Sequence, residues 1–211
     1  IFARYRQALG QSDYPFDEEN GYKGAYIRSI AQDLVAEFGD ALAAETPENL
    51  AVCKQRGETW CFASISKTLE TLGVHHDRFF NENSLYEDGE IERTIATLRE
   101  RGLAYDKDGA VWIATSRLGL ENDRVIVKSA GEPTYRLPDM AYHRIKCERG
   151  DDLVVDIFGA DHISTVQEVI AGVGALGSDA TKIKVVLHQM VSFLKDGQPY
   201  KLSKRNGEQY T

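Results

Sequence analysis

The stretch Leu153–His162, LVVDIFGADH, joins a short β-branched run to a polar turn that contains glycine. Such a run is typical of a buried strand. The residues that follow, Ser164–Leu176, have apolar positions at helical spacing, and Lys184–Val191 (KVVLHQMV) is a second apolar run of strand type. Strand, helix and strand in this order predict a parallel sheet, so we expect an α/β fold in this half of the chain.

The turn GADH follows directly on the first predicted strand, where open parallel sheets bind ligands. Gly159 would let a ligand approach the backbone, Asp161 can accept from two ribose hydroxyls, and His162 can reach a phosphate or a carboxylate. A plain strand-to-helix turn, in which Asp161 caps the helix, explains the tetrapeptide equally well. The four residues alone leave both interpretations open.

A second candidate site is TYRLPDMAYH, Thr134–His143, in which Tyr135 and Asp139 are four residues apart. A carboxylate can bind a planar guanidinium bidentately while an aromatic ring stacks on it, so this pair suits a guanidinium or an ammonium group. The competing interpretation is an acid at a helix N-terminus beside a half-buried strand tyrosine. The ten residues by themselves favour that structural interpretation.

A third candidate is PYKLSKRNG, Pro199–Gly207, with Lys201, Ser203 and Lys204 close together. Charge runs are usually solvated surface. This one follows a predicted hairpin, and two lysines beside a glycine suit the β- and γ-phosphates of a nucleotide. The chain has no Walker-type or G-x-G-x-x-G motif, so we expect a different kind of phosphate loop.

The other elements are predicted from periodicity, capping residues and turn residues. Helices are expected at Gly24–Phe38, Thr46–Leu72 with a potential break at Gly57, Glu90–Arg101 and Pro138–Glu148, and hairpins at 103–114, 124–137 and 193–202.

Composition excludes several classes of protein. A net charge of −8 argues against broad non-specific nucleic-acid binding, and no apolar run approaches the roughly 18 residues that span a bilayer. The three cysteines form no C-x-x-C pair, and His75-His76 have no ligand set around them, so we expect no disulfide framework and no metal site. These features predict a cytoplasmic protein without a membrane partner.

The two ends of the chain suggest a piece of a longer protein. The sequence starts at Ile1 without a methionine, in a segment typical of the end of a helix, and it stops at Thr211, soon after the basic loop. We expect such a piece to have exposed sheet edges and to self-associate.

The order of these motifs is specific. EPTYRLPDMAYHRIK before GADH, and HQMV before KLSKR, resemble the class I aminoacyl-tRNA synthetases, and within that class the arginyl-tRNA synthetases. Asn83–Ser116 is similar to that family's insertion between the halves of its nucleotide-binding fold. The resemblance implies a partial Rossmann-like parallel sheet with helices and an inserted α+β subdomain. The implied domains are an N-terminal helical segment at 1–45, the insertion at 46–128 and the second half of the nucleotide-binding fold at 129–211.

The resemblance also implies roles for individual residues. Lys204 would stabilise the leaving pyrophosphate, with Lys201 and Ser203 assisting around the ATP phosphates. Gly159 and Asp161 would lie against the ribose, with His162 beside the reacting groups. The remaining implied contacts are the adenine with Gln189, Met190 and Val191, and the side chain of the substrate arginine with Tyr135 and Asp139.

The implied reaction joins L-arginine and Mg²⁺-bound ATP to form arginyl-adenylate, and then transfers arginine to the 3′ ribose of its tRNA. No tightly held metal or organic cofactor is implied. The sequence departs from the family because it lacks the HxGH motif and the anticodon-binding domain, so we expect no useful aminoacylation by the 211 residues alone. Another class I synthetase, or a paralog that binds nucleotide or RNA without arginylation, remains an alternative.

Overall fold

A computed structural model gives the structure of the chain and describes residues 1–11, 14–17, 19, 21–189, 191–195 and 197–200. The chain divides into two compact units, one formed by Ile1–Arg78 with the segment from Ser192 onward, the other by Phe79–Val191. Each unit is described by itself. Within the described ranges, no helix is long and apolar enough to cross a membrane. The predicted division at 1–45, 46–128 and 129–211 stays a prediction.

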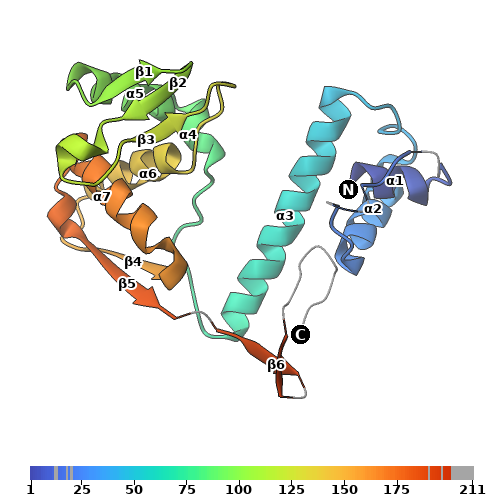
Figure 1. The fold of residues 1–211 in the computed structure, drawn as a ribbon. Helices are drawn as coiled ribbons and strands as arrows, with labels where there is room; N and C mark the ends of the chain where they lie inside the picture. The colour runs from blue at the N-terminus through green and yellow to red at the C-terminus, as the bar shows by residue number, and fades with distance from the viewer. Residues whose placement is uncertain (12–13, 18, 20, 190, 196, 201–211) are drawn as a thin grey trace. The chain divides into compact units, whose positions relative to one another are not determined.

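The first unit is built on three helices with a small apolar core (Figure 1). The helices are α1 (Phe2–Ala8), α2 (Ala25–Phe38) and α3 (Pro47–Thr71), which confirms the helices predicted in this region. The Thr46 hydroxyl accepts a hydrogen bond from the Asn49 amide at 3.2 Å, so it caps α3. The buried core comprises Phe2, Tyr5, Ile30, Ala31, Leu34, Leu42 and Cys53.

Helix α3 passes through Gly57 without interruption, so the break predicted there is wrong. A Cβ atom at Gly57 would lie 2.2 Å from Cδ1 of Ile1, so the glycine makes room for a neighbouring side chain. One glycine costs a helix only about 1 kcal/mol relative to alanine, which packing readily offsets. The same unit contains the antiparallel pair β6 (Phe193–Lys195) and β7 (Gln198–Tyr200), which confirms the predicted hairpin.

In the second unit, two helices precede a three-stranded antiparallel sheet in the order β1-β2-β3 (Figure 1). The first hairpin is confirmed: its turn, Asp108-Gly109, has φ values of 53° and 74°, the left-handed pair that a two-residue hairpin turn requires. The elements are α4 (Asn83–Glu87), α5 (Glu90–Glu100), β1 (Ala104–Lys107), β2 (Ala110–Ile113), a 3-10 turn at Thr115–Leu118 and β3 (Arg124–Val127).

The second predicted hairpin, at 124–137, is wrong in its return strand. Strand β3 pairs with β2, and only one isolated bridge, Val127 to Pro133, continues on its other side. The chain then turns at Thr134, whose carbonyl accepts from the Leu137 amide at 3.1 Å, and it enters helix α6 (Arg136–Glu148). The helix therefore begins two residues before the predicted start at Pro138.

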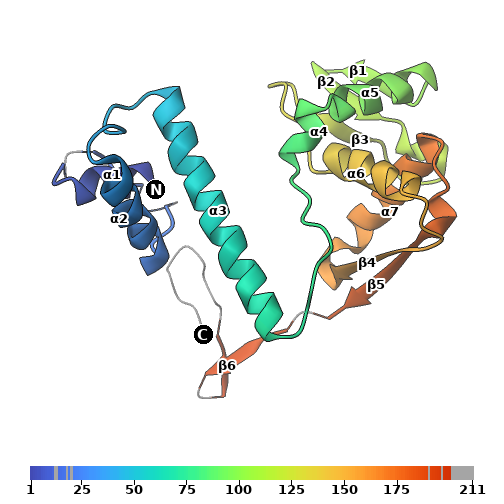
Figure 2. The same cartoon turned by 180° about the vertical axis from the view of Figure 1, so that it is seen from behind.

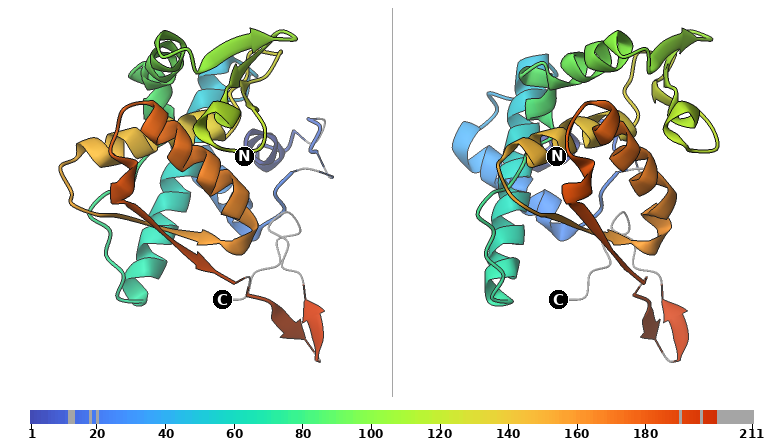
Figure 3. Two further views of the ribbon diagram at one scale, coloured as in Figure 1. Left: turned by 60° about the vertical axis from the view of Figure 1, so that its left-hand side comes forward. Right: turned by 90° about the vertical axis from the view of Figure 1, so that its left-hand side faces the viewer.

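The α/β prediction is confirmed by the second half of this unit. Strands β4 (Val154–Gly159) and β5 (Ile183–His188) pair in parallel, and helix α7 (Ile163–Ala175) connects them. Helices α6 and α7 lie on the same side of the two strands in all views (Figures 2 and 3). On the other face of the sheet, the apolar residues Val155, Ile157 and Val186 are 51%, 70% and 50% exposed, so the described residues leave this face largely uncovered. Self-association through exposed sheet edges, as the sequence analysis expects, stays a prediction.

Helices α6 and α7 approach each other closely at Gly172. A Cβ atom there would lie 2.4 Å from the sulfur of Met140, whose side chain is fully buried. We expect Gly172→Ala to destabilise this unit by about 1–3 kcal/mol, as overpacked cores do, measured as urea unfolding followed by Trp112 fluorescence. The matched control is Gly174→Ala in the same helix, where the new Cβ would have 3.8 Å of space and should stabilise. Equal effects of the two substitutions would contradict the close approach.

Candidate functional site

The carboxyl ends of β4 and β5 lie side by side, because Gly159 pairs with His188 in the parallel register. A 3-10 turn, Ala160–His162, leads from β4 into α7, and Gln189 and Val191 follow β5 as exposed residues. The backbone therefore brings the residues predicted to contact adenosine to one edge of the sheet, where parallel α/β folds bind ligands.

A small pocket at this edge joins the two halves of the predicted site. It is lined from α6 by Asp139 and from the turn before α7 by His162, so the predicted arginine-binding carboxylate and the predicted catalytic histidine share one pocket. Phe158 of β4 lines the same pocket, and its ring centroid lies 6.2 Å from that of His162.

Asp139 is half-buried, and its carboxylate has no hydrogen-bond partner among the described residues. Burial raises the pKa of the Asp139 carboxyl above its usual value, and the nearby Glu82 carboxylate raises it further. Electrostatic interactions with His143, Lys146 and His162 lower the pKa of Asp139, but they do not cancel the rise. A cationic ligand would compensate the charge of this half-buried carboxylate and thereby stabilise its ionised form.

Glu82 is a candidate site residue that the sequence analysis missed. It lies just before α4 and lines two hollows, one shared with Tyr135 and Pro138 and the other with Asp139. Both predicted arginine-binding residues thus adjoin the same second carboxylate. Glu82 is 57 positions before Asp139, and no local motif marks it, so only the fold could reveal it.

Aromatic rings surround these carboxylates. Tyr135 precedes α6 and is 84% exposed. Phe80 stacks on Tyr142 with ring centroids 3.9 Å apart, and both rings line the hollow that contains Glu82 and Asp139. Aromatic faces and carboxylates together form a suitable environment for a guanidinium.

A second polar cluster supports Asp139 from the sheet. Nε2 of the buried His143 lies 2.8 Å from Asp156 of β4, and its Nδ1 lies 2.7 Å from the backbone carbonyl of Asp139. Lys146 also pairs with Asp156. Burial opposes ionisation of Asp156, but hydrogen bonds from His143 and Lys146 outweigh it and hold the pKa of this carboxyl below its usual value.

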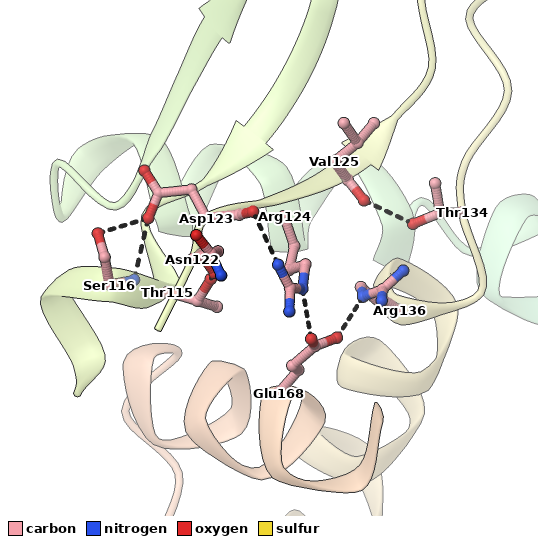
Figure 4. A network of polar contacts seen from close by, with 9 residues as sticks. All are labelled: Thr115, Ser116, Asn122, Asp123, Arg124, Val125, Thr134, Arg136 and Glu168. Atoms are coloured by element: carbon pink, nitrogen blue, oxygen red, sulfur yellow. Dashed lines mark hydrogen bonds and ion pairs between the residues drawn. The ribbon is translucent and has the colours of Figure 1, made fainter. Parts of the chain in front are cut away.

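A third cluster joins β3, α6 and α7 (Figure 4). The buried Glu168 of α7 pairs through one oxygen with Arg124 and through the other with Arg136. Burial again opposes ionisation, and hydrogen bonds from Arg136 and Arg124 outweigh it, so the pKa of Glu168 is lowered. These bonds fix the residue next to Tyr135.

Several other residues named in the sequence analysis lie outside the described residues or away from this site. Lys201, Ser203, Lys204 and Met190 lie outside the described residues, and so does the side chain of Asp161. His75 and His76 are exposed loop residues. Among the residues that the structure describes, no group of three His, Cys, Asp or Glu side chains could hold a metal ion.

Comparisons with known proteins show the family to which the chain belongs. The family model of the class I tRNA synthetases (R), catalytic domain, matches residues 47–210. An arginine–tRNA ligase of Desulfotalea psychrophila is 51% identical over 203 residues, which are 96% of this chain and 36% of that protein. One of Chlorobaculum tepidum is 44% identical over 210 residues, 97% of this chain and 37% of that protein. The chain therefore spans about a third of the length of these curated relatives.

Solved structures show the same fold. A crystal structure described as that of an arginyl-tRNA synthetase from Campylobacter jejuni has a TM-score of 0.81 and 30% identity, covering 95% of this chain and 44% of that one. The arginyl-tRNA synthetase of Plasmodium falciparum has a TM-score of 0.59 at 12% identity, covers 89% of this chain and 34% of its own, and supports the fold alone. The chain belongs to the class I tRNA synthetase family for arginine, within its catalytic domain.

Proposed function

We propose that this chain carries the arginine- and nucleotide-binding part of an arginine–tRNA ligase. The observation that supports this most is the Asp139 carboxylate, which is half-buried, has a raised pKa and adjoins Glu82 beside the carboxyl ends of two parallel strands. In a chain of the arginyl family, a site that disfavours its own negative charge is suited to a cationic substrate side chain.

Arginine is proposed to bind with its guanidinium between Asp139 and Tyr135. Asp139 would accept the planar fork of N–H donors, the Tyr135 ring would stack against it, and Glu82 would supply the second negative charge. Lysine would lose the bidentate geometry and the stacked plane, so the same residues would select arginine against the other long cation.

The proposed reaction has two steps. An oxygen of the arginine carboxylate attacks the α-phosphorus of ATP, the bond to the β-phosphate oxygen breaks, and pyrophosphate leaves with its electron pair. A ribose hydroxyl of the tRNA 3′ end then attacks the arginyl carbonyl and AMP leaves. Gly159, Asp161 and His162, with the residues after β5, would hold the adenosine, and Lys201, Ser203 and Lys204 would neutralise the charge that develops on the phosphates.

Further parts of this proposal concern partners and location. ATP would enter as its Mg²⁺ complex, with no tightly held metal or organic cofactor in the protein. The tRNA for arginine would be the macromolecular partner, and the protein would work in the cytoplasm. Self-association of the chain through exposed sheet edges belongs to the same set of proposals.

The test uses the full-length protein that contains this chain. We expect ATP–pyrophosphate exchange that depends on arginine, is not supported by the other amino acids, and requires the tRNA. We also expect attachment of arginine to that tRNA. Binding of ATP without exchange for any amino acid would contradict the proposal and favour a paralog that binds nucleotide without arginylation.

A further inference from the structure

The backbone on one side of Tyr135 is held by strand β3. The Thr134 amide donates to the Ile126 carbonyl at 2.8 Å, and the Thr134 hydroxyl donates to the Val125 carbonyl at 2.9 Å. The Tyr135 ring itself is 84% exposed. Tyr135 therefore differs from an ordinary surface tyrosine, because the hydrogen bonds of Thr134 fix the backbone that carries its ring.

The backbone on the other side is held by Glu168 (Figure 4). Arg136 directly follows Tyr135, and its Nε donates to one oxygen of the Glu168 carboxylate, while Nε of Arg124 donates to the other. The Glu168 side chain is 6% exposed. We call Glu168 with its two ion pairs the Glu168 brace. Because Arg124 belongs to β3, this brace connects Arg136 to the same strand that holds Thr134.

Both the charge and the position of Glu168 suit it to a fixed brace. Burial opposes ionisation of its carboxyl, and hydrogen bonds from Arg136 and Arg124 outweigh burial and lower its pKa, which favours the ion pairs. Helix α7 begins at Ile163, directly after the Gly159–His162 turn. Glu168 therefore connects the helix that starts at the proposed nucleotide edge to the residue next to the proposed arginine contact.

We propose that Glu168 is a positioning residue for amino-acid binding, which fixes Arg136 and thereby holds the Tyr135 ring where the substrate guanidinium stacks. This inference rests on the proposed role of Tyr135 in arginine binding. Glu168 does not touch the substrate; it acts through Arg136. Small displacements of a contact residue are enough to weaken a directional interaction, so the effect is expected on arginine binding rather than on ATP.

The experiment is a double-mutant cycle in the full-length protein, with arginine and ATP varied separately in aminoacylation. Glu168→Gln is expected to raise the KM for arginine about tenfold and to change the KM for ATP less than about twofold. In a Tyr135→Ala background, which itself raises the arginine KM, Glu168→Gln is expected to add less than about twofold. A brace that acts through Tyr135 requires this non-additivity, and a merely structural one does not.

Each outcome separates the inference from the proposed function. Full additivity of the two substitutions, or an equal rise in the KM for ATP, would overturn the positioning role and leave arginine binding by Tyr135 intact. An unchanged arginine KM in Tyr135→Ala would overturn the role of Tyr135 and the inference together, whereas loss of arginine-dependent exchange in the unmodified protein would refute the proposed function itself.

A second variant guards against failure to fold. Arg136→Gln leaves the pair between Arg124 and Glu168 in place and should give the same selective rise in arginine KM and the same non-additivity. The matched control is Asp106→Asn, which breaks an exposed bidentate pair between Asp106 of β1 and Arg99 of α5 and should leave both KM values unchanged. Thermal melts of all variants check the fold.

Discussion

Asp139→Asn is expected to raise the KM for arginine on the order of a hundredfold in the full-length protein without lowering its thermal stability. The loss follows from removing a charge-assisted, bidentate acceptor from the proposed guanidinium site, which costs about 3 kcal/mol. The KM for ATP should change little, because the proposed role of Asp139 is to bind the arginine side chain. The measurement is aminoacylation with each substrate varied in turn.

The stability expectation comes from the sign of the pKa shift. Burial raises the folded-state pKa of Asp139, so folding disfavours its ionised form. Such a group costs stability above its unfolded pKa of about 3.9, and the cost grows as pH rises through the folded pKa. Asparagine does not ionise, so Asp139→Asn should melt at the same or a higher temperature than the unmodified protein at pH 7, with the difference vanishing near pH 3.

Two further variants sharpen this test. Glu82→Gln should raise the arginine KM less than Asp139→Asn does, up to about tenfold, because its carboxylate is exposed and better screened. Glu87→Gln, at an exposed glutamate at the end of α4, is the matched control and should have no effect. A parallel rise in the KM for ATP, or a lower melting temperature for Asp139→Asn, would show that Asp139 is structural.

Local signals were sufficient for most of the fold. The β-branched run at 154–159 and the helical spacing after it became β4 and α7, since such a strand and an amphipathic helix are set by patterns within a few residues. Burial of that strand on both faces was predicted wrongly, because Val155 and Ile157 are exposed. The cap at Thr46 and the turn at Asp108-Gly109 are equally local. These predictions were confirmed because the decisive contacts lie close in sequence.

The failures share a long-range cause. Thr134–Leu137 has the composition of a strand, yet it opens α6, and Arg136 pairs there with Glu168, which is 32 residues away in sequence. Glu82 reaches the site from 57 residues before Asp139. No propensity or motif encodes such contacts, so the sequence could predict the pair Tyr135 and Asp139 but not the residues that position them or share their charge.

Asp156→Asn is expected to destabilise the second unit by about 2–4 kcal/mol at neutral pH, because it removes the carboxylate that pairs directly with both His143 and Lys146. His143 is buried and the Lys146 side chain is 13% exposed, so solvent replaces the lost partner poorly. The asparagine side chain keeps the shape of the site but cannot compensate the positive charge. This loss is a large fraction of the stability of a small domain.

The pH dependence identifies the cause. The pKa of Asp156 is lowered in the folded chain, so its contribution is fully present above its unfolded pKa of about 3.9 and is lost as pH falls through the folded value. The unfolding free energies of the unmodified chain and Asp156→Asn should therefore differ most near pH 7 and converge toward pH 3. Other carboxyls with lowered pKa, such as Glu168, titrate in both proteins, so the difference between the two curves isolates Asp156.

Urea unfolding followed by tryptophan fluorescence measures this difference. The chain has two tryptophans, Trp60 in α3 of the first unit and Trp112 in β2 of the second, so a Trp60→Phe background makes the signal report the second unit. Asp152→Asn, at an exposed aspartate just before β4, is the matched control and should leave the curve unchanged. A loss for Asp156→Asn that is the same at pH 3 and pH 7 would mean that its packing, rather than its charge, supports His143 and, through it, the backbone of Asp139.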